Sequence, residues 1–433
     1  MVSCTSDEPV PTTTQECISN VPINSIRIST TQAIKIANEA ASVYTTENSR
    51  SARFVNESSD IVAITKNWGR SAATDTLIYI VNYTDNKGFA VISAINIEPR
   101  ILAVIDKGTF DLNNPTNNPG FNLFINCAKD YIADLSLELR YDTTRVKDPT
   151  IIGGSNGDRI PNPGDPSLAG WRFVNDTLRN IRIEPRIDLE WGQESPAGDL
   201  CPNLIAGCAP LAMTMIMAYH KPTQLISYTY PNAYPTSEYV NWNEVNKHKY
   251  NYFKRNSFGS YDYTSFEHIC TSDYATHDVI ARVCRQVGQI ANSDYSNPYS
   301  TSTFSSKYYS TLKHFLPNKN ISTLNSYSIS SASTYITKNN CILMMRGNRI
   351  NDISSGHAWI ADGYIDFCVR TTSWKQNPDT GEWEMYSNSS SGEPKMHYNW
   401  GWNGSENGYY SDKVLTNKNL SNSYTNIEYI AIY

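Results

Sequence analysis

The chain has 433 residues, enough for two or three domains and a sizeable hydrophobic core. Charged residues make up only 18% of it, and the net charge is −6, with acidic and basic residues mixed along the sequence. This balance argues against a nucleic-acid or membrane-surface protein, and no segment is apolar for long enough to span a bilayer. GxxxxGK, HExxH and CxxC motifs are absent, so we expect no nucleotide chemistry and no metal or organic cofactor.

The first 25 residues are predicted to be a flexible tether. They begin MVSCTSDEPVPTTTQEC and contain no apolar stretch of the kind that a signal peptide requires. Val-Ser-Cys followed by a run rich in Ser, Thr, Asp, Glu and Pro resembles the start of a bacterial lipoprotein, in which Cys4 would carry the lipid. That resemblance implies a secreted protein anchored at the cell surface or outer membrane, and a plain disordered tail is the alternative.

Residues 26–145 are predicted to form a small α+β domain. Apolar residues recur at helical spacing in TTQAIKIANEAASVY, residues 30–44. Residues 75–94 indicate two strands around a hairpin turn, because Asp85-Asn86-Lys87-Gly88 lies between two apolar runs. Residues 100–110 predict a third strand and residues 120–141 a second helix.

A stretch rich in Gly, Pro, Asn and Asp separates this domain from the larger remainder of the chain. Residues 146–175 have the composition of an exposed connector, and residues 176–433 are expected to form the second domain. The connector contains GGSNG, which matches the GxSxG nucleophile motif of hydrolases. Prolines and glycines follow it where that motif needs a helix, so we do not expect Ser155 to be a nucleophile.

The segment AGCAPLAMTMIMAYH, residues 206–220, predicts a buried helix that opens with a thiol. Pro210 suits a first turn, and the residues after it leave no polar stripe. Backbone N–H groups and the helix dipole favour a thiolate at a helix N-terminus, so Cys208 is a candidate nucleophile. A buried structural cysteine is the alternative. The nine cysteines are scattered and odd in number, so at least one of them is unpaired.

A catalytic cysteine needs a base, and the chain has seven histidines. His220 is excluded, because twelve residues along one helix place it about 18 Å from Cys208. His357 lies in SSGHAWIADGYIDFCV, at the start of an apolar strand that we expect to turn at Asp362-Gly363 and return. Gly356 before it leaves room for a substrate backbone.

His397, in KMHYNWGWNG, is the rival base. Strand alternation places His397 and Asn399 on one face and Trp400 on the other, and Asn399 is a natural partner to fix an imidazole tautomer. We interpret His397 as structural. Upstream, Gln193 supplies an amide that could complete an oxyanion site with the backbone N–H of Cys208.

The order Gln, Cys, His, Asn is that of papain-like thiol proteases. WGQESP, AGCAPLAMTMIMAYH, GHAWIADGY and HYNWGWNG together resemble the streptopain family of bacterial cysteine peptidases. LIYIVNYTDNKGFAVISA and AIKIAN resemble that family's propeptide. The resemblance implies an α+β, papain-like fold with two lobes, a helical lobe that carries the cysteine and an antiparallel sheet lobe that carries the histidine. An inhibitory propeptide domain, residues 26–145, precedes them.

The same resemblance implies the roles of individual residues. Cys208 would be the nucleophile, His357 the general base and Gln193 the oxyanion donor, while Asn399 and Trp400 would position and shield the histidine. Three residues are expected to contact the substrate, namely Gly207, Ser355 and Gly356. The implied function is a secreted cysteine endopeptidase made as a zymogen. Its substrates are proteins or peptides, its propeptide inhibits it intramolecularly, and an activating cut falls in the connector.

Two other classes of function stay open. Another thiol hydrolase, such as a cell-wall amidase or an acyl transferase, would share the chemistry but would not need a propeptide. An inactive binding or adhesion protein on the same fold predicts the loss of at least one catalytic residue, and none is lost from this sequence.

Overall fold

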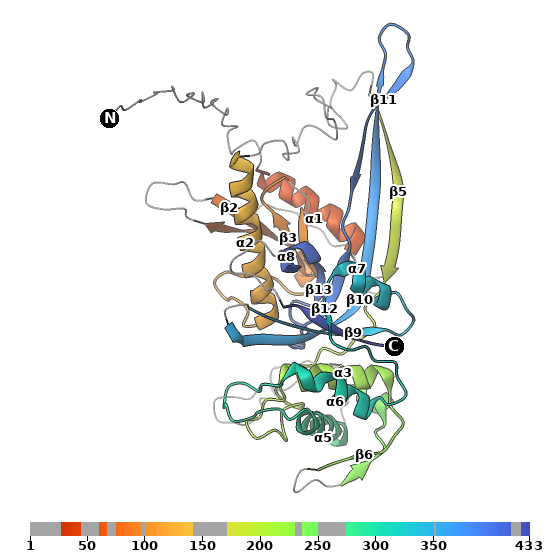
Figure 1. Cartoon of the computed structure of the whole chain (residues 1–433). Coiled ribbons are helices and arrows are strands. Elements are labelled where there is room, and N and C mark those ends of the chain that lie inside the picture. The colour runs from red at the N-terminus through yellow and green to blue at the C-terminus, as the bar shows by residue number, and fades with distance from the viewer. Residues whose placement is uncertain are drawn as a thin grey trace, which may run out of the picture.

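The computed structural model describes residues 27–44, 60–66, 75–96, 100–141, 171–229, 236–249, 274–349, 352–416 and 426–433. Helices α3, α5 and α6 gather in a lobe at one end of the molecule (Figure 1). Twelve of the described strands form one sheet, from which a long arm extends away from the helical lobe, and two further strands form a separate pair. The predicted α+β, two-lobed architecture is therefore confirmed.

The N-terminal domain is a sheet covered by one helix on each face. Its helices are α1 (Thr30–Tyr44) and α2 (Pro119–Tyr141), and its strands are β1 (Ile61–Lys66), β2 (Asp75–Asn82), β3 (Phe89–Ser93) and β4 (Ile101–Ile105). Side chains of α1 pack with one face of the sheet and those of α2 with the other. The two helices and three of the strands agree with the sequence predictions, whereas β1 was not predicted.

The predicted hairpin between β2 and β3 is confirmed. Asp85 and Asn86 have φ angles of 58° and 55°, the left-handed conformation that a tight hairpin turn needs. The Tyr83 N–H donates to the Gly88 carbonyl across the turn over 2.9 Å. A Cβ at Gly88 would overlap the Ile105 carbonyl, so glycine is required there for space as well as for its φ of 91°.

The sheet of the N-terminal domain continues without a break into that of the second domain. The strand order is β1-β2-β3-β4-β13-β12-β10-β9-β14-β8, and β4 pairs antiparallel with β13 through Val104↔Tyr409 and its neighbours. The strands of the second domain on this path are β8 (Asn325–Ser326), β9 (Ile342–Arg349), β10 (Asp352–Gln376), β12 (Lys395–Asn399), β13 (Gly408–Ser411) and β14 (Glu428–Ile432). Backbone pairing thus joins two regions that the sequence separates.

The expected turn at Asp362-Gly363 is wrong, because β10 runs straight through it. At this point β10 pairs with β12, with a register shift between Ala361 and Gly363, and from Tyr364 onward it also pairs with β5 (Trp171–Ile183). A Cβ on Gly363 would lie 2.9 Å from the His397 Cβ and 3.1 Å from the Ile183 carbonyl. The glycine therefore allows neighbouring strands to approach and does not reverse the chain.

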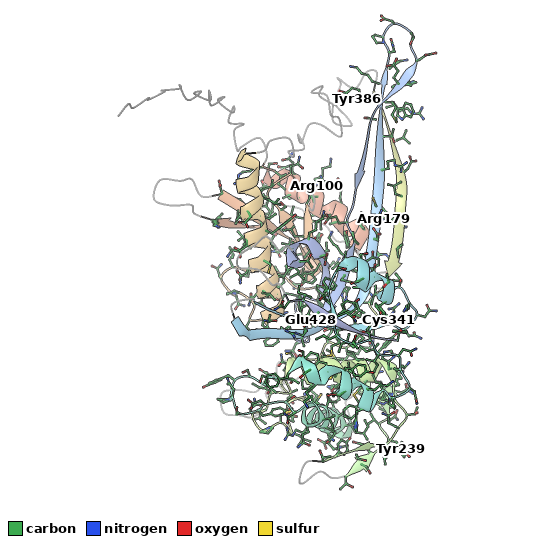
Figure 2. All side chains as sticks on the ribbon, viewed as in Figure 1. Arg100, Arg179, Tyr239, Cys341, Tyr386 and Glu428 are labelled. Atoms are coloured by element: carbon green, nitrogen blue, oxygen red, sulfur yellow. The ribbon has the colours of Figure 1, made fainter. Side chains whose placement is uncertain are left out.

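The arm consists of β5, the second half of β10, and β11 (Trp383–Ser391). Arg179 on β5 donates to Asp366 on β10 over 2.8 Å, and Figure 2 shows Arg179 along the arm with Tyr386 nearer its tip. The predicted end of the connector at residue 175 lies inside β5. The tether, Ser155 and the rest of the connector lie outside the described residues.

The helical lobe is built around α3 (Cys208–His220), as predicted. All residues from Ala209 to Ala218 are buried. Around α3 lie α4 (Trp242–Val245), α5 (Tyr274–Ile290), α6 (Tyr308–Phe315) with the short helix η7 (Ser305–Lys307), and the strand pair β6 (Ile226–Ser227) and β7 (Ser237–Glu238). Helices α7 (Ile329–Ile336) and α8 (Asp412–Thr416) pack on the sheet. Across the described ranges, no helix combines the length and apolar character needed to cross a membrane.

Candidate active site

Cys208 lies where the helical lobe meets the sheet. Helix α3 packs against β10, and the backbone of Ala358, the residue after His357, lies near enough to the thiol to lower its pKa. Gly207 precedes the thiol with a φ of 92°, and a Cβ there would lie 2.9 Å from Thr301. Glycine is thus needed at this turn. The half-buried Cys208 is placed at a helix N-terminus beside the strand that carries His357.

Two residues that the sequence analysis missed hold the loop before Cys208. The Asn203 side-chain amide donates to the Ser300 carbonyl over 3.1 Å and to the Thr301 hydroxyl over 3.0 Å. Thr301 donates in turn to the Ile205 carbonyl over 2.8 Å. No local pattern marks these residues, because the partners are almost one hundred residues apart in the sequence.

His357 is buried on β10 and is held by a backbone carbonyl. Its Nε2 lies 2.9 Å from the carbonyl oxygen of Trp400, and since a carbonyl can only accept, Nε2 carries the proton and Nδ1 the lone pair. The ring stacks on Trp359, with centroids 6.2 Å apart and planes at 11°. The imidazole is therefore fixed in both orientation and tautomer.

Both the thiol and the imidazole are uncharged at neutral pH in this arrangement. Burial raises the pKa of the Cys208 thiol, and backbone hydrogen bonds at Ala358, Ala209 and Cys208 itself act in the opposite direction. Burial lowers the pKa of His357 to about 4, against the smaller opposite effect of the Trp400 carbonyl. No hydrogen bond between described residues joins Cys208 to His357. The structure thus holds the two groups near each other without a thiolate–imidazolium pair.

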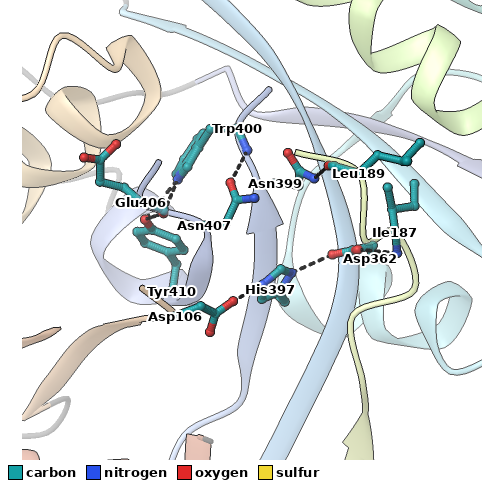
Figure 3. A network of polar contacts seen from close by, with 10 residues as sticks. All are labelled: Asp106, Ile187, Leu189, Asp362, His397, Asn399, Trp400, Glu406, Asn407 and Tyr410. Carbon is teal, nitrogen blue, oxygen red and sulfur yellow. Dashed lines mark hydrogen bonds and ion pairs between the residues drawn. The ribbon is translucent and has the colours of Figure 1, made fainter. Parts of the chain in front are cut away.

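Gln193 and Asn399 both lie close to the elements of this site. The Gln193 carbonyl accepts the Ala206 N–H over 2.8 Å, which places Gln193 beside the chain that leads into Cys208. The Asn399 amide donates to the Leu189 carbonyl over 2.8 Å (Figure 3). Its oxygen accepts the Gly401 N–H over 3.1 Å. In this structure Asn399 therefore fixes neighbouring backbone and makes no hydrogen bond to His357.

Trp400 links His357 to the N-terminal domain. Its indole N–H donates to the Glu406 carbonyl over 3.0 Å and to the Tyr410 hydroxyl over 2.9 Å, and the ring is fully buried (Figure 3). Gly120, in the first turn of α2, packs so closely on the ring that a Cβ would overlap it. The N-terminal domain thus rests directly on the residue whose carbonyl holds the imidazole.

The three residues expected to contact substrate differ in exposure. Gly356 is exposed beside His357, whereas Gly207 is buried before Cys208. Ser355 lies on β10, and its side chain falls outside the description. Within the described ranges no group of three or more His, Cys, Asp or Glu side chains is placed to bind a metal ion.

The cysteines described besides Cys208 are all buried: Cys127, Cys201, Cys284, Cys341 and Cys368. Burial raises the pKa of the Cys201 thiol to about 11 and that of Cys284 to about 12. Such thiols react slowly, because the thiolate is the nucleophile. Cys208, which is only half-buried, is the most accessible of the described cysteines.

His397 lies on β12 between two carboxylates, and in this structure neither of its nitrogens is free to act as a base. Its Nδ1 is 2.6 Å from Asp362 Oδ1, and its Nε2 is 2.8 Å from Asp106 Oδ2 (Figure 3). Burial by itself lowers the pKa of His397, but the two carboxylates outweigh it and raise that pKa to about 10. Both ring nitrogens therefore carry protons at neutral pH, and neither can accept one.

The chain is similar to known peptidases and to a known type of peptidase inhibitor. The family model described as "Peptidase C10 family" matches residues 191–410, just over half of the chain, and the model described as "Spi protease inhibitor" matches residues 25–132. No curated protein matches the chain. Among solved structures, a fragment of Prevotella intermedia prointerpain A is similar, with 18% sequence identity and a TM-score of 0.49. The match covers 85% of this chain and 98% of that one.

Proposed function

The chain belongs to the peptidase C10 family, the streptopain family, and we propose that Cys208 is its nucleophile and His357 its general base. The protein is a cysteine endopeptidase made as a zymogen, with an inhibitor domain at its N-terminus. One observation carries the assignment of the two residues. Cys208, at the N-terminus of α3, contacts the backbone of Ala358, the residue directly after His357.

On this proposal, removal of the N-terminal domain lets the His357 ring leave the Trp400 carbonyl and turn its unprotonated Nδ1 toward the Cys208 thiol. The contact between Gly120 and the Trp400 ring supports the coupling, because that contact disappears with the domain. His357 then takes the thiol proton, and the resulting thiolate is favoured by the N-terminus of α3. Asn399 and Trp400 are proposed to orient and shield the imidazolium after this rearrangement.

The proposed chemistry is acyl transfer to sulfur followed by hydrolysis. The Cys208 sulfur attacks the carbonyl carbon of the scissile peptide bond, and the negative charge moves to the carbonyl oxygen. The Gln193 side-chain amide and the Cys208 backbone N–H are proposed to donate to that oxygen. His357 protonates the leaving amine as the C–N bond breaks, which leaves a thioester. Water, deprotonated by His357, then releases the acid and restores the thiol.

Protein or peptide substrates follow from the family and from the inhibitor domain. We propose that Gly207, Ser355 and Gly356 contact the substrate, and that an activating cut falls in residues 146–175. We further propose that the enzyme is secreted and held at the cell surface or outer membrane by a lipid on Cys4. The N-terminal sequence supports this location. The inhibitor domain favours a peptidase over a cell-wall amidase or acyl transferase.

Labelling with an epoxide inhibitor of cysteine peptidases tests the proposal. After removal of the N-terminal domain, we expect one modification, at Cys208, together with loss of activity. The buried cysteines should stay unmodified, because their thiols are protonated and inaccessible. Peptide mass mapping identifies the site, and the same processed chain after unfolding, with its six remaining cysteines accessible, is the control. Inactivation without modification of Cys208 would show that another residue is the nucleophile.

His357 and His397 are expected to differ sharply when each is replaced. His357→Ala should lower kcat/KM by about as much as loss of Cys208, because a nucleophile and its base act as a unit. His397→Gln should lower kcat/KM of the processed enzyme far less, since His397 pairs with Asp362 and no hydrogen bond between described residues joins it to Cys208 or His357. Peptidase assays on the two processed variants check this. The reverse order of losses would place the base on β12 and not on β10.

A further inference from the structure

His397 makes charge contacts with both domains, as Figure 3 shows. Asp106 comes from the N-terminal domain, directly after β4, whereas Asp362 comes from β10 of the second domain. The side chains of His397 and Asp362 are 4% and 0% exposed, and that of Asp106 is 25% exposed. Removing one partner of an ion pair so far out of water is costly, because the other charge is left buried and unpaired.

We infer that His397 and Asp362 form a binding site for a carboxylate on a strand paired with β13, which in this chain is the carboxylate of Asp106. This site would retain the propeptide on the enzyme after the connector has been cut. This inference rests on the proposed function, because it treats the N-terminal domain as a propeptide that has to dissociate before the enzyme is active.

Backbone pairing delivers the carboxylate to this site. The register Gly408↔Ile105 ends the ladder between β4 and β13, and the next residue, Asp106, donates its N–H to the Asn407 carbonyl over 2.9 Å. On the neighbouring strand His397 pairs with Tyr409. Asp106 therefore reaches past β13 to His397, and the register of β4 on β13 places it there.

The second domain keeps its half of the site without Asp106. The carboxylate of Asp362 bonds His397 through Oδ1 and accepts the Ile187 N–H through Oδ2 over 2.9 Å. Loss of the N-terminal domain would leave His397 Nε2 as a donor with no carboxylate beside it. A buried donor in this state favours rebinding of an acceptor, and an anionic one above all.

The charged groups around the imidazole favour its cationic form. Asp106 and Asp362 face its two nitrogens, and the Tyr409 ring packs against it with centroids 5.1 Å apart. Glu184 and Arg182, which pair with each other over 3.4 Å, lie close enough to Tyr409 to affect its pKa. The raised pKa of His397 means that the imidazole is cationic at neutral pH, and its attraction for the Asp106 carboxylate is lost as pH rises through about 10.

Another ion pair across the same interface provides a matched comparison. Lys107, the neighbour of Asp106, pairs with Glu190 of the second domain, but its side chain is 45% exposed. Exposed pairs of this kind contribute little to stability or binding, because water and salt screen them. Two adjacent residues thus make one buried and one exposed charge contact with the same partner domain.

The test measures how firmly the cut propeptide stays bound. The full chain carrying Cys208→Ala, which cannot process itself, is cut in the connector with trypsin and diluted, and the dissociation constant of the two fragments is measured. We expect Asp106→Asn to weaken binding by roughly tenfold or more, the usual penalty for truncating one partner of a buried charge pair. Lys107→Gln should weaken it by only about threefold or less. A loss with Asp106→Asn no greater than that with Lys107→Gln would overturn the inference.

A second variant guards against a simple folding defect. His397→Gln should weaken binding as Asp106→Asn does, and the double variant should lose little more than either single one, since the two residues share one interaction. Fully additive losses would overturn the inference. Raising the pH from 7 toward 10 should weaken binding in the parent chain but not in Asp106→Asn. These assays read binding in an inactive chain, so the peptidase activity of the uninhibited parent tests the proposed function separately.

Discussion

Replacing Cys208 with alanine is expected to abolish peptidase activity and to leave the fold intact. Loss of a catalytic nucleophile removes several orders of magnitude from kcat, roughly 10⁴-fold or more. The fold should tolerate the change, because Cys208 is half-buried at the first position of α3 and the helix core begins at Ala209. The measurement is hydrolysis of an unfolded protein substrate by the processed chain, with thermal unfolding followed in parallel.

Cys341→Ala is the matched control for this experiment. Cys341 is fully buried at the start of β9, so its replacement should cost about 1–2 kcal/mol of stability through lost packing. The folded fraction should keep its activity. Replacement of Cys208 would then affect activity alone, and replacement of Cys341 would affect stability alone. A Cys208→Ala enzyme that kept a tenth of its activity would contradict the assignment of the nucleophile.

Cutting the connector and removing residues 1–145 should raise activity by at least about 100-fold, the usual contribution of a positioned acid–base group. In the uncut chain His357 donates to the Trp400 carbonyl and its pKa is lowered to about 4, so it cannot deprotonate the thiol efficiently at neutral pH. Trypsin can cut after Lys147 and Arg159 in the connector and after Arg145 directly before it. Activity assays before and after digestion, with N-terminal sequencing of the stable fragment, give the result.

A chain without these three tryptic sites is the control for activation. With glutamine at all three positions, the same digestion should leave residues 1–145 attached and activity low. A parallel rise of activity in both chains would show that trypsin acts elsewhere. Full activity in the uncut parent, with no gain on digestion, would contradict the latent arrangement of His357 while leaving the catalytic residues in place.

Sequence patterns predicted the helices and turns that are determined by neighbouring residues. The helix from Cys208 to His220 and the hairpin at residues 85–88 follow from spacing and turn chemistry, and both are present. The turn expected at Asp362-Gly363 failed, because the same dipeptide can reverse a chain or admit a neighbouring strand. The pairing of β10 with distant strands decides between a turn and a continuous strand, and a single sequence does not reveal that pairing.

The candidate active site was likewise predicted only in part from the sequence. Residue types and chain order were enough to select Cys208, His357 and Gln193 as candidates. They could not reveal that His357 is held by Trp400, since the acceptor is a backbone carbonyl and every residue has one. The role of Asp106 was also hidden, because its contact with His397 spans 291 positions of sequence and depends on pairing between domains.

The continuous sheet has a consequence for the released enzyme. When the N-terminal domain departs, β13 changes from an interior strand into an edge, and its backbone N–H and C=O groups lose their partners on β4. Such an edge invites pairing with other chains, and it carries the aromatic rings of Tyr409 and Tyr410, which are now buried. Its length of four residues limits that risk of self-association. The N-terminal domain therefore also covers a sheet edge that its release exposes.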